Sequence, residues 1–418
     1  MLLVGIILKM KKIILHIGRH KSGTTSLQKT FSTNRKKFLS AGVFYPFQGV
    51  RDDAHHLIAE KLMSVTFNNS YILESDRLLS DFKSELNSCD ENTILISSEA
   101  FQNCKPEIIK AYFKGFDLKI VFYIREQLSY LCSAYQQKVH ATDYFGSIED
   151  FESSFDADYY KFYLNWARVF SSENLFLRVF SRETLYKGDV IADFSHELLF
   201  KAFGIEINFD GIELDPLKNN ISLTGDILNF KLRLNKFLNM EALSEPIIYI
   251  ALGIISSKIK QKAELIDLKL SVKVKNKYEE SNKKLLELVS LPGEYLAFSG
   301  DFPATVSKKF IGPILFRSIL EEIIESCSTC RFLRPLLYWV CLREQGEQYV
   351  LSISDNIKAD CVNHLYINKD GSSLKKVTDV VFIEQGNMVF DKEEFYLETD
   401  GFVLKLGENT YDVKLILS

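Results

Sequence analysis

The sequence predicts an α/β fold, in which a parallel sheet is flanked by helices and is followed by a small C-terminal antiparallel β module. Two observations predict the α/β part. Short apolar runs alternate with segments whose apolar residues recur at helical spacing, and the first run leads through a glycine-bracketed loop into a helix. Such runs are typical of parallel strands that helices cover on both faces. From residue 348 onward, short alternating strands and turn residues replace the helical pattern and predict the β module.

The first strand is predicted at residues 13–17, and the loop after it has the layout of a phosphate-binding site. Gly18 and Gly23 bracket a basic stretch, and the chain then enters a helix that continues over residues 26–39. At a helix start the main-chain N–H groups are free and the dipole is positive, so an anion is favoured there. The loop therefore indicates chemistry on a nucleotide phosphate.

Three further strands are predicted, at residues 92–98, 118–124 and 174–180. Glu99 comes at the end of the first of these strands and Arg125 at the end of the second. His16 lies near the end of the strand at residues 13–17. Because ligands of parallel sheets bind beyond the carboxyl ends of the strands, these residues are candidates for a site. Residues 42–46 are predicted as a turn. Helices are predicted at residues 52–63, 75–86, 106–113, 159–170, 189–203, 224–239 and 275–289.

With 418 residues, the chain is long enough for two or three domains. We expect an α/β domain over residues 10–303, a helical connection over residues 304–347 and the β module over residues 348–418. In the last of these, Asp400-Gly401 stands between two apolar segments, FYLET and FVLKL, and is a strong signal for a two-residue hairpin. Further turn signals lie at residues 369–371, 385–387 and 407–409.

Composition limits the choice of partners and compartment. The net charge is −4, from 51 basic and 55 acidic residues, which argues against a nucleic-acid partner. Seven cysteines, an odd number, do not form a disulfide framework, so we expect reduced thiols in a cytoplasmic protein. The apolar residues before Lys9 are too few to span a bilayer and lack the features of a signal peptide. We expect no transmembrane segment; peripheral contact with the inner face of the membrane is the alternative.

The loop differs in one respect from the P-loop of nucleoside triphosphatases, which reads GxxxxGK[ST]. Here Thr24 follows the second glycine, and the lysine, Lys21, precedes it. KSGTT placed in this way resembles the 5′-phosphosulfate loop of sulfotransferases that use 3′-phosphoadenosine 5′-phosphosulfate (PAPS). The longer string HIGRHKSGTTSLQ is most similar to the bacterial, carbohydrate-type branch. The resemblance implies a P-loop-like fold and transfer of a sulfuryl group from PAPS to a hydroxyl.

The resemblance also implies where the donor is held. Arg125 and Ser133, eight residues apart, resemble the 3′-phosphate site of the family. Arginine binds phosphate through two N–H groups, and a hydroxyl adds another donor. No metal is expected. The residues expected to contact the donor are Arg19, His20, Lys21, Ser22, Gly23, Thr24, Thr25, Ser26, Arg125 and Ser133.

Four residues are candidates for catalysis. The Lys21 ammonium would neutralise the charge that develops on the departing phosphate oxygen. The acceptor hydroxyl needs a base, and the resemblance favours Glu99 because family members carry histidine or glutamate at the end of the corresponding strand. His55 and His56 are rival bases. Neighbouring residues of a helix point about 100° apart, so at most one of the two histidines is expected to serve.

How adenine is held stays open, because Ser26 occupies the position where many family members carry a stacking tryptophan. Tyr123 and Tyr135 are candidates for this role. The acceptor implied by the bacterial relatives is a carbohydrate or a glycolipid, and the oligomeric state is left open. Two rival functions are a P-loop nucleotide kinase or NTPase, and a non-catalytic nucleotide-binding protein of polysaccharide biosynthesis.

Overall fold

The computed structural model describes residues 10–19, 21–66, 69–207, 225–238 and 265–292, short segments between residues 223 and 325, and the strands given below between residues 340 and 417. The chain divides into two compact units. The first contains Met1–Ala134, Glu152–Asn220 and Ile266–Ala304; the second contains Tyr135–Phe151, Ile221–Leu265 and Thr305–Ser418. The domain ranges expected from the sequence stay a prediction.

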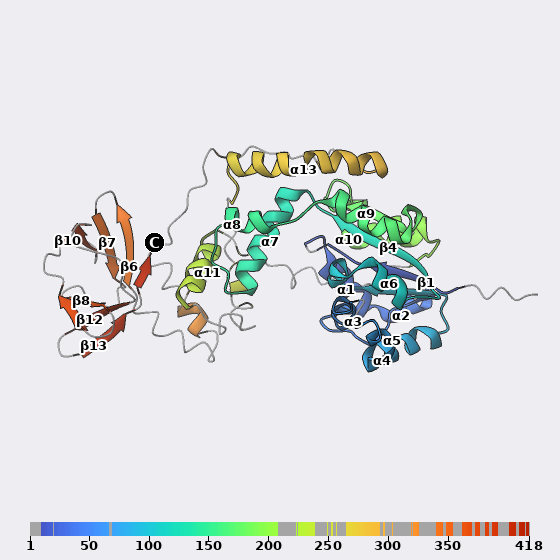
Figure 1. The fold of residues 1–418 in the computed structure, drawn as a ribbon, viewed down its shortest axis with the longest axis horizontal. Helices are drawn as coiled ribbons and strands as arrows, with labels where there is room; N and C mark the ends of the chain where they lie inside the picture. The colour runs from blue at the N-terminus through green and yellow to red at the C-terminus, as the bar shows by residue number, and fades with distance from the viewer. Residues whose placement is uncertain are drawn as a thin grey trace, which may run out of the picture. The chain divides into compact units, whose positions relative to one another are not determined.

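A five-stranded parallel sheet lies at the centre of the first unit (Figure 1). Its strands are β1 (Lys12–His16), β2 (Val43–Phe44), β3 (Thr93–Ser97), β4 (Asp117–Ile124) and β5 (Leu175–Val179). They are arranged in the order β2-β3-β1-β4-β5, and every neighbouring pair is parallel. The predicted α/β class is thus confirmed. The predicted turn at residues 42–46 is wrong in part, because β2 adds an edge strand there.

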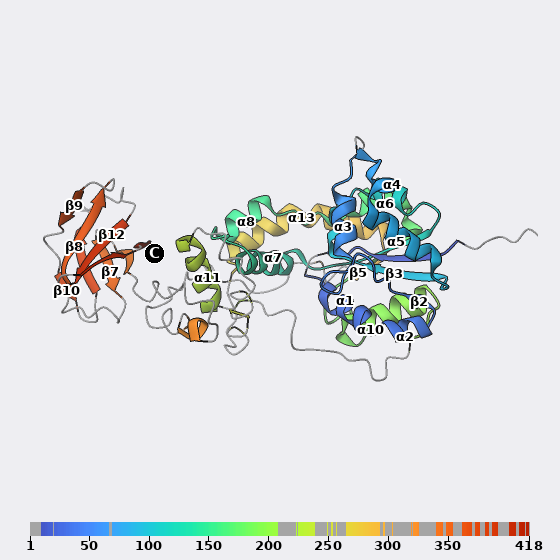
Figure 2. The ribbon, with the colours of Figure 1, turned by 90° about the horizontal axis from the view of Figure 1, so that it is seen from below.

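Helices cover both faces of this sheet. In Figure 2, α1, α2 and α10 lie on one face, and α3, α5 and α6 lie on the other. The predicted helix at residues 26–39 is divided in two at Asn34, and the one predicted at residues 189–203 is a short α-helix that continues as a π-helix, Phe194–Ala202. The α-helices are α1 (Thr24–Thr33), α2 (Arg35–Ser40), α3 (His56–Met63), α4 (Ile72–Ser75), α5 (Arg77–Ser88), α6 (Pro106–Tyr112), α7 (Gln127–Ala141), α8 (Ile148–Ser154), α9 (Tyr159–Phe170), α10 (Val190–Asp193), α11 (Gly225–Leu238) and α13 (Leu268–Leu288).

The position of β1 at the centre of the sheet explains why its sequence is continuously apolar. From Ile13 to His16, no residue of β1 has exposed surface. On the α1 face, Ile14 joins a buried cluster that includes Phe31 of α1 and Phe194 of the π-helix. Burial of apolar side chains on both faces holds β1 in place, and this fixes the position of the loop that follows it.

A buried carboxylate fixes the segment that follows β5. The Asp193 side chain is fully buried and accepts hydrogen bonds from the Tyr123 hydroxyl (2.9 Å), from Arg178 Nε and Nη2 (2.7 and 2.6 Å) and from the main-chain N–H of Tyr186 (2.9 Å). These donors come from β4, β5 and the segment itself. Because a buried charge is stable only when it is paired and hydrogen-bonded, this set ties the segment firmly to the sheet.

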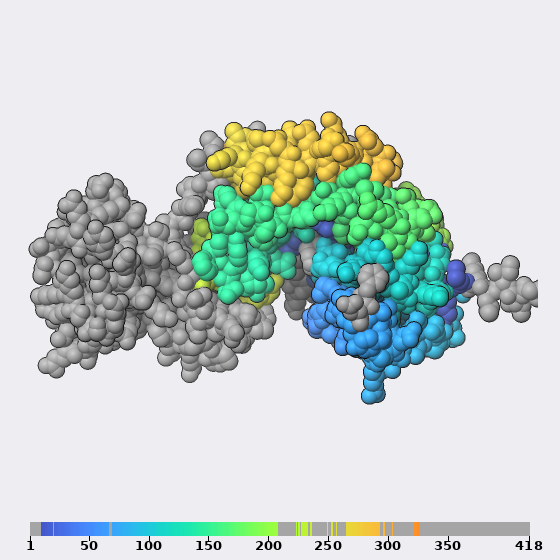
Figure 3. All heavy atoms as spheres, viewed as in Figure 1, coloured from blue at the N-terminus to red at the C-terminus, as the bar shows by residue number. Residues whose placement is uncertain are grey.

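The long helix α13 lies along α9 at the surface of the first unit (Figures 1 and 3). Lys277 pairs with the buried carboxylate of Glu152, at 2.8 Å between Nζ and Oε1. A buried amide pair also holds the helix: Gln127 Nε2 donates to Asn282 Oδ1 at 2.7 Å. These contacts join α13 to Glu152 of α8 and to the start of α7.

The strands of the C-terminal part form two sheets, in the orders β10-β11-β7-β6-β14 and β13-β12-β8-β9. All pairs are antiparallel except β14 with β6, so the predicted antiparallel module is confirmed with one parallel addition. The three predicted turns at residues 369–371, 385–387 and 407–409 fall between paired strands, whereas the FYLET segment lies outside the described residues. The strands are β6 (Val340–Gln345), β7 (Gln348–Ile353), β8 (Val362–Lys369), β9 (Ser373–Lys376), β10 (Val381–Ile383), β11 (Asn387–Asp391), β12 (Gly401–Leu406), β13 (Asn409–Val413) and β14 (Leu415–Leu417).

Within the part of the chain that the structure describes, no helix is both long enough and apolar enough to cross a lipid bilayer.

Candidate functional site

The strand order predicts the position of a ligand-binding crevice, between β1 and β4. These two strands are neighbours, but the chain leaves β1 toward β2 at one edge of the sheet and leaves β4 toward β5 at the other edge. In an open parallel sheet such a reversal opens a crevice beyond the carboxyl ends of the two strands, and ligands bind there. The glycine-bracketed loop follows β1 and Arg125 follows β4, so both lie at this point.

Both glycines of the loop are required by close packing. Gly18 has φ of 53°, and a Cβ atom there would come within 2.8 Å of Thr24 Cγ2 and 2.9 Å of Glu99 Cβ. Gly23 has φ of 79°, and a Cβ atom there would come within 2.7 Å of the Phe180 ring. A larger residue at either position would be strained in its backbone and would also clash. The loop thus touches the residues that follow β3 and β5.

The start of α1 has the properties of an anion site. Gly23 is its N-cap residue, no side chain among the described residues caps it, and its first turn contains no acidic residue. The Ser22 hydroxyl is not directed to the helix, because it donates to the carbonyl oxygen of Arg19 at 2.6 Å and closes the loop on itself. Thr24 is buried, and Thr25 and Ser26 are partly exposed in the first turn. Their main-chain N–H groups can therefore bind an anion.

The structure brings Lys21, Arg125 and Glu99 together at the crevice. Burial lowers the pKa of the Lys21 ammonium; the nearby Arg125 guanidinium lowers it further, and the Glu99 carboxylate partly offsets this. Arg125 Nη1 lies 3.4 Å from the carbonyl oxygen of Lys21, and burial lowers the pKa of Arg125 as well. Lys21 itself has φ of 65°, a conformation that residues other than glycine seldom adopt. Two partly desolvated cations that act on each other electrostatically favour binding of a multiply charged anion.

Arg19 is placed differently from Lys21. Its guanidinium lies against three aromatic rings, at 5.7 Å from the centroid of Tyr130, 5.4 Å from Tyr159 and 4.6 Å from Phe162. It also donates to the carbonyl oxygen of Asp156 at 3.3 Å, and only 9% of the residue is exposed. This guanidinium anchors the loop to α7 and α9, so its predicted contact with a donor stays a prediction. The predicted donor ligand His20 lies outside the described residues.

Glu99 follows β3 and begins a short 3₁₀-helix, Glu99–Asn103. Gln28, a buried residue of α1, donates from Nε2 to Glu99 Oε2 at 2.7 Å. Since Gly18 touches the Glu99 backbone and the Glu99 charge acts on Lys21, the carboxylate belongs to the same crevice as the loop. This placement suits a base that acts on a group bound beside the loop.

The two rival histidines differ in their surroundings. His55 is fully buried; its Nε2 donates to the Pro46 carbonyl oxygen at 3.2 Å, and its Nδ1 accepts from the Ser97 N–H at 3.2 Å. Burial lowers its pKa to about 3, so the ring is neutral and both nitrogens are engaged. This placement argues against His55 as a base. His56 is partly exposed, and its Nδ1 lies 2.8 Å from Ser98 Oγ, beside Glu99.

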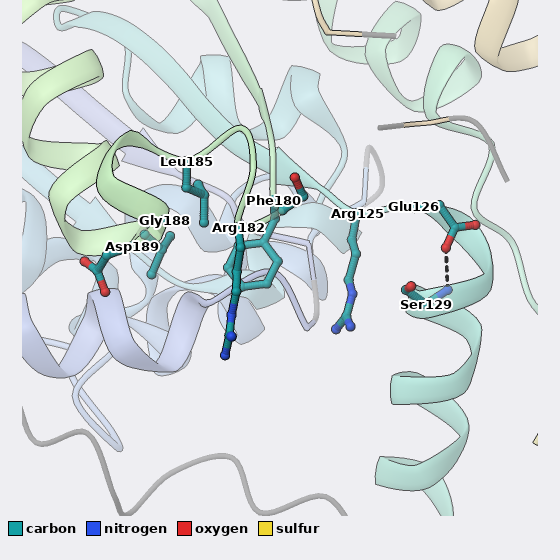
Figure 4. A pocket seen from close by; sticks show the side chains of 10 residues that line it. Arg125, Glu126, Ser129, Phe180, Arg182, Leu185, Gly188 and Asp189 are labelled. Carbon is teal, nitrogen blue, oxygen red and sulfur yellow. Dashed lines mark hydrogen bonds between the residues drawn. The ribbon is translucent and has the colours of Figure 1, made fainter. Parts of the chain in front are cut away.

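A pocket of about 440 Å³ adjoins Arg125. Figure 4 shows the side chains of Arg125 and Arg182 pointing into the same open space. Its two acidic residues are engaged elsewhere: Glu126 accepts from main-chain N–H groups at the start of α7, and Asp189 does so at the start of α10. Among the described residues, neither arginine forms an ion pair. The pocket is lined by Arg125, Glu126, Ser129, Phe180, Ser181, Arg182, Leu185, Gly188, Asp189 and Val190.

The pocket adds residues that the sequence did not single out. Ser129 lines it, whereas the predicted Ser133 lies one turn further along α7, is partly buried and does not line it. Arg182 and Phe180 follow β5, whose end was predicted at residue 180, and the position of this strand end was the one signal for them. Neither tyrosine suggested for adenine is available for stacking. Tyr123 is fully buried, with its hydroxyl on Asp193, and the buried Tyr135 donates to the Gly146 carbonyl oxygen.

Comparisons with known proteins give a relative that matches part of the chain and a structural neighbour. No family model matches the chain. An uncharacterized protein from Archaeoglobus fulgidus is 32% identical over 117 residues, which are 27% of this chain, and the chain spans only 31% of the length of that relative. The crystal structure of a sulfotransferase from Alicyclobacillus acidocaldarius aligns with 56% of this chain and 95% of its own, at 14% identity and a TM-score of 0.31.

Proposed function

We propose that this chain is a sulfotransferase that moves a sulfuryl group from PAPS to a hydroxyl of a carbohydrate or glycolipid acceptor. The observation that carries the proposal is the convergence of Lys21, Arg125 and Glu99 at one crevice, beside a helix start that no described side chain caps. Two cations and free N–H groups suit a phosphosulfate. A carboxylate beside them suits proton abstraction from a hydroxyl.

The donor would lie with its phosphosulfate on the loop and its 3′-phosphate toward the pocket. Arg125 and Arg182 supply two cations there, and Ser129 supplies a hydroxyl. Ser133 stays a proposed contact one turn further along the helix. Phe180 packs against Gly23 and lines the same pocket, so its ring is our candidate for contact with adenine. The volume lies within the range of roughly 300–1,000 Å³ that small-molecule sites occupy.

The chain would contribute a base and a charge-neutralising cation to the reaction. Glu99 accepts the proton of the acceptor hydroxyl while the acceptor oxygen forms a bond to sulfur. The bond between sulfur and the 5′-phosphate oxygen breaks in line with this attack, and Lys21 neutralises the charge that this oxygen gains. The sulfuryl group ends on the acceptor, the proton ends on Glu99, and adenosine 3′,5′-bisphosphate is released. No metal is required by this scheme.

The acceptor class rests on the sequence resemblance to bacterial carbohydrate sulfotransferases. A cytoplasmic location, with peripheral contact at the inner face of the membrane as an alternative, belongs to the same proposal. Cys89, Cys104 and Cys132 are free thiols and are compatible with a reducing compartment.

A kinase or NTPase is the main rival, and Thr24 disfavours it because the lysine of the P-loop motif is missing at this position. The test is mass spectrometry of a bacterial glycan and lipid pool incubated with the protein and PAPS. We expect a species heavier by one sulfo group, absent when Lys21→Ala replaces the wild type. A pool that stays unchanged, although the nucleotide binds, would favour the non-catalytic rival.

A further inference from the structure

We propose that Gln28 is the positioning residue of the base: its side-chain amide holds the Glu99 carboxylate beside the phosphate loop and favours its ionised form. This inference rests on the proposed function, because it assigns a role within that site. The contact that carries it is the hydrogen bond from Gln28 Nε2 to Glu99 Oε2, at 2.7 Å.

The burial of Gln28 indicates a specific role for its amide. Only 2% of the residue is exposed, and it lies on α1 among residues that pack on the sheet. A buried amide without a partner is costly, whereas an apolar side chain has no polar group that needs one. The glutamine is thus explained by its partner, and its partner is the residue we propose as the base.

A second contact on the same face of α1 supports this role. Thr24 precedes Gln28 by four residues, so the two side chains lie one above the other on the helix. A Cβ atom at Gly18 would meet both Thr24 Cγ2 and Glu99 Cβ, so these two side chains meet at Gly18. One helix therefore presents its N–H groups to the donor and also fixes the residue that acts on the acceptor. This arrangement sets the distance between base and donor.

The other titratable groups around Glu99 leave a defined task for the amide. His16 of β1, Lys21 of the loop and Tyr45 after β2 all interact with the Glu99 charge. Burial lowers the pKa of His16 to about 4 and raises that of Tyr45, so both are neutral near pH 7. Lys21 is the cation among these three described groups, but its charge is needed by the departing phosphate. Gln28 gives Glu99 a neutral hydrogen-bond donor that no step of the reaction removes.

The test is a direct titration of Glu99, which needs neither donor nor acceptor. The protein is labelled with ¹³C at the glutamate side-chain carboxyl carbon, and the Glu99 resonance is identified by its loss in Glu99→Gln. Gln28→Leu removes the hydrogen-bond donor, and we expect the titration midpoint to rise by about one pH unit or more. Gln28→Glu keeps the shape and adds a second carboxylate. We expect two separated protonation steps in its titration, and the step at higher pH should lie well above the wild-type midpoint.

Gln127→Leu is the matched control. Gln127 is also a fully buried glutamine whose amide donates at 2.7 Å, but to Asn282. We expect this variant to lose stability and to leave the Glu99 midpoint unchanged. The inference is overturned if both Gln28 variants titrate like the wild type, or if Gln127→Leu moves the midpoint as much. Binding of adenosine 3′,5′-bisphosphate, measured on the same samples, tests the proposed function separately: its absence would reject the function without touching the titration result.

Discussion

Arg125 donates a hydrogen bond to the main-chain carbonyl oxygen of Lys21, with 3.4 Å between Nη1 and the oxygen. The bond joins the end of β4 to the loop after β1, across the point where the sheet topology reverses. It also supports Lys21 in its left-handed backbone conformation. One guanidinium therefore faces the pocket and also steadies the loop, so a change at Arg125 should act mainly on the group bound in the pocket and to a lesser extent on the loop.

Replacing Arg125 with alanine should weaken binding of adenosine 3′,5′-bisphosphate by about 10- to 100-fold, because a hydrogen-bonded charge pair with phosphate is lost. Isothermal titration calorimetry measures the change. Adenosine 5′-phosphate, which lacks the 3′-phosphate, should lose much less affinity. Equal losses for both nucleotides would mean that Arg125 acts on the loop alone.

Arg182→Ala should also weaken binding of adenosine 3′,5′-bisphosphate, by roughly 10-fold, since Arg182 is exposed and shares the pocket with Arg125. Arg168→Ala, which changes an exposed arginine of α9 outside the pocket, is the control. If the two variants bind the nucleotide equally well, the pocket does not hold its 3′-phosphate.

Lys21→Ala should reduce turnover by roughly 10²–10³-fold, because the departing phosphate oxygen loses its counter-charge. Donor binding should also depend on pH in a defined direction. The protonated ammonium binds the donor and its pKa is lowered, so affinity is present below this pKa and is lost as the pH rises through it. Lys21→Arg should move this loss to higher pH, because arginine stays charged. If donor affinity falls over the same alkaline pH range in the wild type and in Lys21→Arg, Lys21 does not have this role.

Glu99→Gln should leave affinity for adenosine 3′,5′-bisphosphate nearly unchanged and reduce transfer by roughly 10²–10⁴-fold. His56→Ala should retain most of the transfer rate, as should His55→Ala after correction for the fraction of folded protein. The rate is measured as formation of the sulfated product that was identified in the glycan pool. If Glu99→Gln keeps the full rate while His56→Ala loses it, the base is His56.

The burial of neutral His55 predicts how the stability of the protein depends on pH. Its folded-state pKa is about 3, well below the ordinary value of 6.5, so below pH 6.5 the unfolded chain takes up a proton that the folded protein does not. The free energy of unfolding should therefore fall with decreasing pH, by about 1.4 kcal/mol per pH unit from this residue. In His55→Asn the slope should be smaller by this amount, whatever its absolute stability. Urea unfolding measures both slopes, and parallel curves would show that His55 is not buried in its neutral form.

The sequence predicted the parts of the fold that depend on local pattern. The strands at residues 13–17 and 118–124 match β1 and β4, because an apolar strand buried on both faces leaves a continuous signal. The two-residue strand β2 has too short a pattern, and its residues are set by pairing with β3. The break between α1 and α2 involves the single residue Asn34, and such a short interruption leaves little trace in the apolar pattern.

The positions of the candidate site residues were predictable where these residues follow strand ends, and less so where distant segments meet. Glu99 and Arg125 could be placed in one crevice because both follow parallel strands of one sheet. Arg19 and Lys21 look equivalent in the sequence, but Arg19 packs against rings that α7 and α9 supply from more than a hundred residues away. The role of Arg182 depends on how the segment after β5 is folded back by Asp193, and no pattern in the sequence encodes that path.

The most direct test of the central claim is the stability of the wild-type protein in the presence of adenosine 3′,5′-bisphosphate or of Mg·ATP. A crevice built for a doubly phosphorylated adenosine should be stabilised by about 2.7 kcal/mol when adenosine 3′,5′-bisphosphate is present at a hundred times its dissociation constant. Mg·ATP at the same concentration should have little effect. Stabilisation by Mg·ATP alone, or by neither nucleotide, would contradict the account.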